Sequence, residues 1–242
     1  MDSIDINKII DDKKNNNSKK YIHRTNIKEK SVRFSFYITY AFLMTTATIT
    51  FIEAMRTKDI KIRNILNLET CISVVAAFFY GMFMKKINTD KINYKDITIN
   101  RYVDWSITTP IMLLVLILAF SYNNGKLITL KSFLLILFFN YGMLLFGFFG
   151  ETNYMNKYKS NFIGFIFFIA LYYYIYITHI KNYKIFDNNI LYGSFIFLWS
   201  LYGVVYFLDE KEKNVSYNVL DLFSKCFVGI FFWAYFTKAL VL

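Results

Sequence analysis

The sequence predicts an all-α integral membrane protein, a bundle of seven transmembrane helices. Of its 242 residues, 56% are hydrophobic and 21% aromatic, and soluble domains have an apolar content of roughly 45–50%. The apolar residues form long blocks with almost no charge, and a bilayer core about 30 Å thick needs about 20 such residues per helix. The connectors between blocks are short and polar, which disfavours a soluble domain between spans. We therefore expect no enzymatic activity.

Seven blocks are long enough to cross a bilayer. The first reads FSFYITYAFLMTTATITFIEAM and the fourth SFLLILFFNYGMLLFGFFG, and neither alternates as the strands of a β-barrel do. Helices are expected because a backbone in hydrocarbon must satisfy its own hydrogen bonds. The first six blocks end at RTKDIKIR, KKINTDKINYKD, SYNNGK, ETNYMNKYK, KNYKIFDNN and LDEKEKN. In chain order, we expect the spans at residues 34–56, 64–84, 97–122, 128–150, 160–180, 188–208 and 215–241.

Residues 1–33 differ from the rest of the chain. They are polar, charged and rich in Asn and Lys, and they lack the apolar core of a secretory signal peptide. We expect a disordered tail here, followed by the seven-helix domain at residues 34–242; a role for the lysines at the membrane surface is the alternative. The net charge of +11 lies mostly in the tail and loops, so it indicates no nucleic-acid partner. Lysines occur in both sets of loops, so charge alone does not orient the bundle.

Six ionisable residues lie within or near the ends of the expected spans, where charges are costly and usually functional. Asp221 and Lys225 lie in the body of the seventh span, four residues apart and therefore on one helix face. A lysine at this depth must be paired, neutralised or chemically consumed, and a Schiff base with an aldehyde is one known use of a desolvated lysine. The other four are Glu53, Glu69, Arg101 and Asp104.

The third span supplies groups that complement the lysine. Arg101, Asp104 and Thr108 form one stripe. A buried protonated Schiff base needs a nearby carboxylate to keep its proton, so Asp104 and Asp221 can both serve, with Arg101 balancing the two negative charges. Thr108 can hydrogen-bond Asp104. Residues at helical spacing in the third, fourth and sixth spans could wall a slot for an elongated apolar aldehyde: Trp105, Asn140, Met143, Gly147, Trp199, Tyr202 and Tyr206.

The motifs RYVDWSITTP, LWSLYGVV and VLDLFSK together resemble those of the microbial (type 1) rhodopsins over residues 34–241. The resemblance implies all-trans retinal bound covalently to Lys225 as a protonated Schiff base, with Asp104 as primary counterion and proton acceptor and Asp221 as second counterion. It assigns Arg101 to gating of the extracellular side. By the same resemblance, Trp105, Trp199, Tyr202 and Tyr206 enclose the chromophore, Met143 and Gly147 lie at its ring, Thr109 and Asn140 join two helices, and Met112 tunes the colour.

The resemblance also implies an extracellular N-terminus, a cytoplasmic C-terminus and a homo-oligomer, a trimer or pentamer, in a lipid bilayer, with no metal. The Asn/Lys/Ile-rich composition resembles that of the rhodopsins of giant marine viruses. Gly203 stands where many relatives carry a proline. The counterion–threonine–donor motif reads Asp104, Thr108 and Val115, and Val115 cannot donate a proton.

Another acid must therefore supply the proton that Val115 cannot. Glu69 or Glu53 could do so if it faces the bundle; the alternative is that Glu53 pairs with Arg56, and Glu69 with Arg63 or Lys61. On the other side of the membrane, the connector LDEKEKN offers Asp209, Glu210 and Glu212 as members of a proton-release cluster, or as a solvated loop.

Three functions fit these residues. The first is light-driven outward proton transport from the Schiff base on Lys225 to Asp104. The second is a light-gated cation channel, in which Glu53, Glu69, Ser73 and the threonines of the first span line a water-filled path. The third is a sensory photoreceptor that acts through a partner. A seven-helix receptor of the G-protein-coupled type would not explain Asp221 and Lys225 in the last span.

Overall fold

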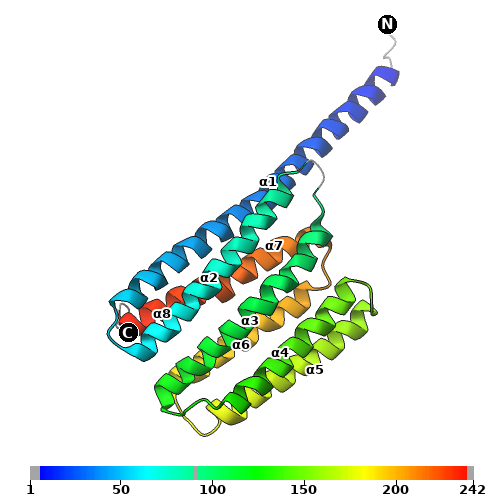
Figure 1. The fold of residues 1–242 in the computed structure, drawn as a ribbon. Helices are drawn as coiled ribbons and strands as arrows, with labels where there is room; N and C mark the ends of the chain where they lie inside the picture. The colour runs from blue at the N-terminus through cyan, green and yellow to red at the C-terminus, as the bar shows by residue number, and fades with distance from the viewer. Residues whose placement is uncertain (1–5, 90–91, 239–242) are drawn as a thin grey trace.

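A computed structural model describes residues 6–89 and 92–238, with side chains from residue 29 onward. Within these residues the chain forms one bundle of seven helices (Figure 1), the last of which is divided into three parts. The elements are α1 (Ile6–Arg56), α2 (Ile60–Ile87), α3 (Tyr94–Asn124), α4 (Leu130–Glu151), α5 (Lys157–Ile175) with η1 (Tyr176–Ile180), α6 (Phe186–Val205), α7 (Glu210–Asp221), η2 (Leu222–Phe227) and α8 (Val228–Thr237).

The prediction of a seven-helix membrane bundle is confirmed. In the described part of the chain, six helices have the length and apolar composition to cross a bilayer. The sixth helix, α6, falls short of that composition, because polar residues such as Asp187, Asn188 and Asn189 occupy its first turn. It nevertheless packs beside α7 and α3 in the same bundle. The protein is therefore an integral, multi-pass membrane protein.

Local signals in the sequence explain where the helices begin and end. Asp59 accepts hydrogen bonds from the backbone N–H groups of Lys61 and Ile62, and Asn93, Thr129 and Asn156 cap α3, α4 and α5 in the same way. At the end of α3, Gly125 has a φ of 70°, a left-handed conformation that glycine adopts without strain. Polar connectors therefore set the helix ends within a few residues of the expected spans.

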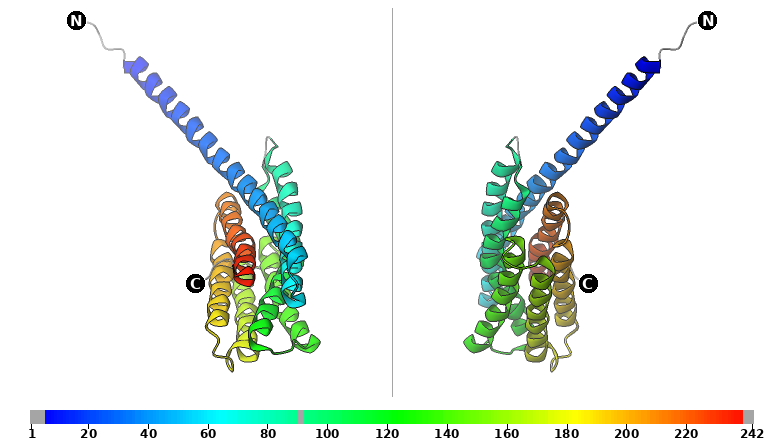
Figure 2. Two further views of the ribbon diagram at one scale, coloured as in Figure 1. Left: turned by 90° about the vertical axis from the view of Figure 1, so that its left-hand side faces the viewer. Right: turned by 90° about the vertical axis from the view of Figure 1, so that its right-hand side faces the viewer.

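The first helix begins at Ile6, well before the expected span, and its N-terminal part projects away from the bundle (Figures 1 and 2). This differs from the disordered tail that we expected at residues 1–33, of which residues 1–5 lie outside the described residues. The physical reason is that residues 6–33 contain no Gly or Pro, and adding turns to an existing helix is much easier than starting one. The boundary between tail and domain at residue 33 remains a prediction.

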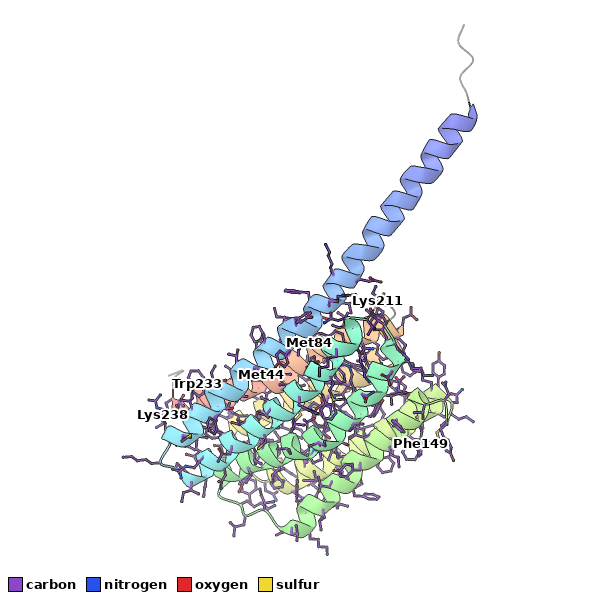
Figure 3. The ribbon with its side chains drawn as sticks, turned by 45° about the horizontal axis from the view of Figure 1, so that its top comes forward. Met44, Met84, Phe149, Lys211, Trp233 and Lys238 are labelled. Carbon is purple, nitrogen blue, oxygen red and sulfur yellow. The ribbon has the colours of Figure 1, made fainter. Side chains whose placement is uncertain are left out.

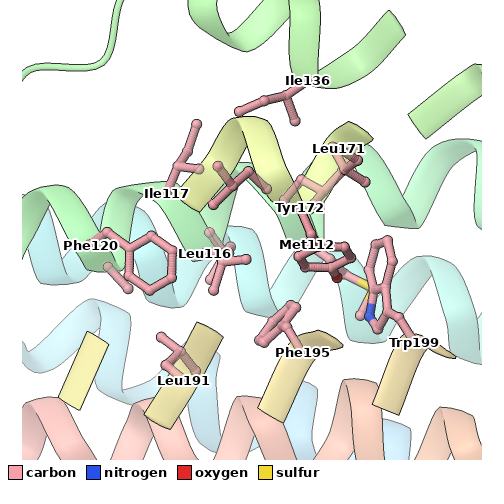
Figure 4. Packing of buried hydrophobic residues seen from close by; sticks show 14 of the residues in the cluster. Met112, Leu116, Ile117, Phe120, Ile136, Leu171, Tyr172, Leu191, Phe195 and Trp199 are labelled. Carbon is pink, nitrogen blue, oxygen red and sulfur yellow. The ribbon is translucent and has the colours of Figure 1, made fainter. Parts of the chain in front are cut away.

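The largest buried cluster lies between α3, α5 and α6. Figure 4 shows Met112, Leu116 and Phe120 of α3 facing Leu171 of α5 and Phe195 of α6. The outer face is apolar as well, as in Phe78, which is 66% exposed and suits contact with lipid. Figure 3 shows side chains on all sides of the bundle, with Lys211 and Lys238 near the two ends of the last helix.

The last helix is irregular at its centre. Residues Leu222–Phe227 form a π-helical segment, η2, which contains Lys225. Such segments occur mostly as single turns within α-helices and frequently at functional sites. The sequence predicts a regular helix here, so this local change was not foreseen.

Candidate functional site

Lys225 lies at the centre of the bundle and is buried, with 2% of its surface exposed. Its Nζ donates a hydrogen bond to Asp104 Oδ2 at 2.7 Å and lies 3.8 Å from Asp221 Oδ1. The two carboxylates come from different helices, α3 and α7, and Asp104 is the nearer.

Asp221 and Asp104 differ in how their oxygens are occupied. Asp221 accepts hydrogen bonds from the hydroxyls of Tyr80 and Tyr202, both at 2.8 Å, and from Arg101 Nη1 at 3.3 Å. Asp104 is fully buried, and among the described residues its Oδ1 has no hydrogen-bond partner. Asp221 is therefore held by three donors, whereas Asp104 is bonded through Oδ2 to Lys225.

Arg101 is fully buried and bound mainly to the last helix. Its Nε donates to Asn214 Oδ1 at 3.0 Å, and its Nη2 donates to Asn218 Oδ1. Four aromatic rings lie within 5.8 Å of the guanidinium, those of Phe36, Tyr80, Phe83 and Tyr217. Arg101 forms its ion pair with Asp221, at 3.3 Å, because its side chain reaches towards α7.

The site is electrically balanced. Lys225 and Arg101 carry two positive charges, and Asp104 and Asp221 carry two negative charges, and all four side chains are at most 1% exposed. Buried charges are costly unless they are paired and hydrogen-bonded. Four charged side chains with no net charge are therefore an arrangement that can be buried at this depth in the bundle.

A mostly apolar cavity opens beside Lys225 between α3, α4, α5 and α6. Trp105 and Tyr202 pack edge to face, with ring centroids 5.5 Å apart, and the indole Nε1 of Trp105 has no partner. The cavity is therefore a slot with a lysine at one end and aromatic walls. Of the residues predicted to form it, those that line it are Trp105, Thr109, Met112, Met143, Gly147, Trp199, Tyr202, Tyr206 and Lys225.

Two predicted residues hold the site from outside the cavity. Asn140 does not line it, but its Nδ2 donates to Thr109 Oγ1 at 2.9 Å and joins α4 to α3. Thr108 does not bind the Asp104 carboxylate: its Oγ1 donates to the Asp104 backbone carbonyl at 2.9 Å. A helical threonine commonly bonds the carbonyl four residues earlier, which explains the difference.

Glu53 and Glu69 lie in unlike surroundings. Glu53 has a salt bridge of 3.9 Å with Arg56, as the alternative interpretation anticipated. Glu69 is only 2% exposed and has no ion pair with Arg63 or Lys61. A Cβ placed on Gly229 would lie 3.1 Å from Glu69 Oε2. Glu69 therefore faces the last helix, one turn beyond Lys225.

Sequence reasoning missed several residues of the site. Tyr80, Asn214, Asn218 and Tyr217 contact Arg101 or Asp221, and Ser224 Oγ is 2.8 Å from the Tyr202 hydroxyl. One signal was present: Asn214, Asn218, Asp221 and Lys225 follow each other at spacings of four, three and four, a polar stripe on one helix face. Nothing in the sequence singled out Tyr80 among so many aromatic residues.

Seven helices around a buried lysine that is paired with a carboxylate define the class of microbial rhodopsins. The chain matches the family described as Bacteriorhodopsin-like protein over residues 30–239. It belongs to this family, and is therefore a light-absorbing retinal protein.

Individual relatives agree with this assignment. The crystal structure of viral rhodopsin OLPVRII is 53% identical, with a TM-score of 0.83, and the match covers 87% of this chain and 99% of that one. The chain thus groups with the viral microbial rhodopsins. The green-light absorbing proteorhodopsin of Gamma-proteobacterium EBAC31A08 is 25% identical over 217 residues, 82% of this chain and 84% of the relative. Xanthorhodopsin, described as a light-driven ion pump with dual chromophore, shares the fold at 17% identity, with a TM-score of 0.69 over 85% of this chain and 92% of that one.

Proposed function

We propose that the protein is a light-driven outward proton transporter, in which a proton passes from a Schiff base on Lys225 to Asp104. The observation that carries this proposal is the 2.7 Å contact between Lys225 Nζ and Asp104 Oδ2, together with the vacant Oδ1 of the same carboxylate. Proton transfer needs donor and acceptor within hydrogen-bond distance, and this pair meets that condition.

The cavity supports all-trans retinal, bound to Lys225 as a protonated Schiff base, as the cofactor. The mostly apolar, aromatic walls of the cavity suit an elongated apolar polyene, and Lys225 in its lining supplies an amine for the aldehyde. When bound, the cofactor supplies light absorption and a change of shape. Trp105, Trp199 and Tyr202 would hold it from the sides, and Met143 and Gly147 would border its far end.

The residues around Lys225 give the proton transfer a direction. Asp104 can accept the proton of Nζ because its Oδ1 is free, whereas the Asp221 oxygens are already bound by Tyr80, Tyr202 and Arg101. Transfer of the proton from Nζ to Asp104 neutralises both groups, so the group of four keeps a total charge of zero and Arg101 and Asp221 remain as its charged pair.

Glu69 is the residue that we assign to returning the proton to Lys225 in place of Val115. It faces Gly229, four residues after Lys225, which corresponds to about 6 Å along a helix. Within the part of the chain that the structure describes, the buried hydroxyls of Thr46 and Ser73 have no hydrogen-bond partner, and Thr46 lies beside Gly229 as well. Polar atoms of this kind favour a bound water that could complete the path from Glu69 to Lys225. Glu53 is less suited because it pairs with Arg56.

Outward transport requires an extracellular N-terminus and a cytoplasmic C-terminus, as the resemblance implies. Glu69 then lies towards the cytoplasm, and Arg101 towards the outside. By the same family analogy, we propose a homo-oligomer, a trimer or a pentamer, in the bilayer.

A light-gated cation channel is the second candidate. It is favoured by the unpartnered hydroxyls of Thr46 and Ser73 beside Glu69, which could admit water between α1, α2 and α8. Against it, the hydroxyls of Thr45 and Thr48 bond carbonyls of their own helix and lie on the exposed face. A sensory role through a partner remains the third candidate.

A voltage series of photocurrents in whole cells tests the proposal. A transporter of protons keeps an outward current at all voltages, whereas a channel current reverses near the equilibrium potential of its ion. An outward current that persists when external sodium is replaced supports proton transport. A reversing current contradicts it in favour of the channel, and no current at any voltage favours the sensor.

A further inference from the structure

A second group of buried charges lies at the Arg101 end of the bundle. Lys213 of α7 has a fully buried side chain, and its Nζ donates to both oxygens of Glu151 at 2.9 Å and to Glu210 Oε1 at 2.8 Å. Lys157 Nζ lies 3.9 Å from Glu151 Oε1. We call these four residues the Lys213 cluster. It joins the neighbouring ends of α4 and α5 to the beginning of α7, which is far from them in the sequence.

The Lys213 cluster is connected to the site around Lys225. Glu210 Oε2 accepts a hydrogen bond from Thr98 Oγ1 at 2.8 Å, and Thr98 Oγ1 accepts one from Asn214 Nδ2 at 2.9 Å. Asn214 Oδ1 in turn accepts the bond from Arg101 Nε. Thr98, Arg101 and Asn214 are fully buried, whereas the Glu210 side chain is 34% exposed. Glu210 is therefore the point at which this connection reaches solvent.

The charges of the Lys213 cluster cancel. Glu151 and Glu210 both converge on the Lys213 ammonium, and Lys157 supplies a second positive charge. The Tyr206 ring packs against both cations, 5.0 Å from Lys157 Nζ and 5.9 Å from Lys213 Nζ. Two carboxyl groups held this close without a cation could not both ionise and would share a proton. With Lys213 between them, both can stay charged.

We propose that Lys213 is a positioning residue that keeps Glu151 and Glu210 both ionised in the dark, so that the Lys213 cluster stores no proton. This inference rests on the proposed proton transport. When Asp104 later gives up its proton, an O–H bond of Asp104 breaks, an O–H bond of Glu210 forms, and Glu210 then loses the proton to solvent. The medium therefore acidifies only when Asp104 deprotonates, and never before.

The test compares the purified wild-type pigment with Lys213→Met. A pH-indicating dye reports proton release after a flash, and infrared difference spectra report the C=O band of protonated Asp104. In the wild type, we expect release to coincide with loss of that band. In Lys213→Met, we expect a carboxylic C=O band in the dark, and this band should disappear when Glu151→Gln or Glu210→Gln is added. We also expect proton release to occur about 10-fold or more earlier than the loss of the Asp104 band.

Lys157→Met is the matched control, since it removes the partly exposed cation at 3.9 Å and leaves the Lys213 contacts in place; wild-type timing is expected. Wild-type release while Asp104 is still protonated would overturn the proposal, as would unchanged timing and no dark C=O band in Lys213→Met. If Lys213→Met does not fold, the timing of proton release relative to loss of the Asp104 band in the wild type still tests the proposal. If Asp104 never becomes protonated, the proposed function fails, and the dark band of Lys213→Met alone decides this inference.

Discussion

The two sides of Lys225 are built in opposite ways. On the Arg101 side, made up of Arg101, Thr98, Asn214 and Glu210, hydrogen bonds run unbroken from the buried site to solvent. The Glu69 side consists of Glu69, Thr46, Ser73 and Gly229, and in the described part of the chain the hydroxyls of Thr46 and Ser73 have no hydrogen-bond partner.

This difference shows how a single bundle can place proton release and proton uptake on opposite sides of Lys225. The charges on the Arg101 side are each paired, Arg101 with Asp221 and Glu210 with Lys213, so they can remain in place. When no cation or hydrogen-bond donor lies beside a carboxyl group, burying the neutral acid costs less free energy than burying the carboxylate. Glu69 is such a group. The Arg101 side therefore suits side chains that stay charged, and the Glu69 side suits an acid that transfers its proton to Lys225.

Lys225→Ala removes the residue at which the two sides meet, and it has the largest expected effect. No pigment should form when all-trans retinal is added, because no amine remains in the cavity to bind the aldehyde. The visible absorption of the purified protein measures this. Lys213→Met is the control and should still become coloured, since Lys213 lies outside the cavity. Full colour in Lys225→Ala would disprove the attachment site.

Asp104→Asn tests which carboxylate accepts the proton. We expect a red-shifted pigment, because the negative charge 2.7 Å from Lys225 Nζ is lost, and transport reduced by about 100-fold or more. Absorption spectra and photocurrents measure the two effects. Asp221→Asn removes the carboxylate at 3.8 Å and should shift the colour less. If Asp221→Asn gave the larger shift, the two carboxylates would have to exchange roles.

Asn214→Leu breaks the connection on the Arg101 side. Arg101 Nε loses its acceptor and Thr98 loses a donor, both in a fully buried place, so we expect a loss of about 1–3 kcal/mol in stability. Thermal bleaching of the pigment measures this. Asn189→Leu is the matched control: Asn189 is exposed and bonds only a carbonyl of its own helix, so it should change stability by less than about 0.5 kcal/mol. Equal bleaching of the two variants would contradict the account.

Gly229→Ala disturbs the Glu69 side by a single methyl group, and its expected effect is the smallest. The new Cβ would lie 2.7 Å from Thr46 Cγ2 and 3.1 Å from Glu69 Oε2, so both side chains must shift. We expect the proton to return to Lys225 a few times more slowly, with the colour unchanged. Flash photolysis measures the rate. Gly81→Ala meets nothing within 4 Å and should behave as the wild type.

Much of the fold and the centre of the site could be predicted from the sequence. Apolar blocks between polar connectors locate the helices, because the thickness of a bilayer fixes their length. Asp104, Asp221 and Lys225 were identifiable because charges are rare inside spans. Lys213 and Glu151 were not, since charges near connectors usually lie in solvent, and only the three-dimensional packing of α4 against α7 buries this pair.

The hydrogen-bond partner of each side chain could not be predicted from the sequence either. Periodicity placed Thr108 on the face of Asp104, but it could not tell the carboxylate from the backbone carbonyl that Thr108 actually binds. In the same way, periodicity could not show that Glu53 and Glu69 have different surroundings. Which of the two acids faces the bundle depends on how the first two helices are rotated, which no local pattern specifies.

The measurement that tests the central claim most directly is the rate at which Lys225 regains its proton in Glu69→Gln, compared with Glu53→Gln. Glu69→Gln keeps the size of the side chain and removes the acid, so we expect the return to slow by about 100-fold or more and to be restored by azide, a small weak acid that can diffuse to the site. Glu53→Gln should behave as the wild type. Unchanged kinetics in Glu69→Gln, or slowing in Glu53→Gln alone, would contradict the assignment of Glu69.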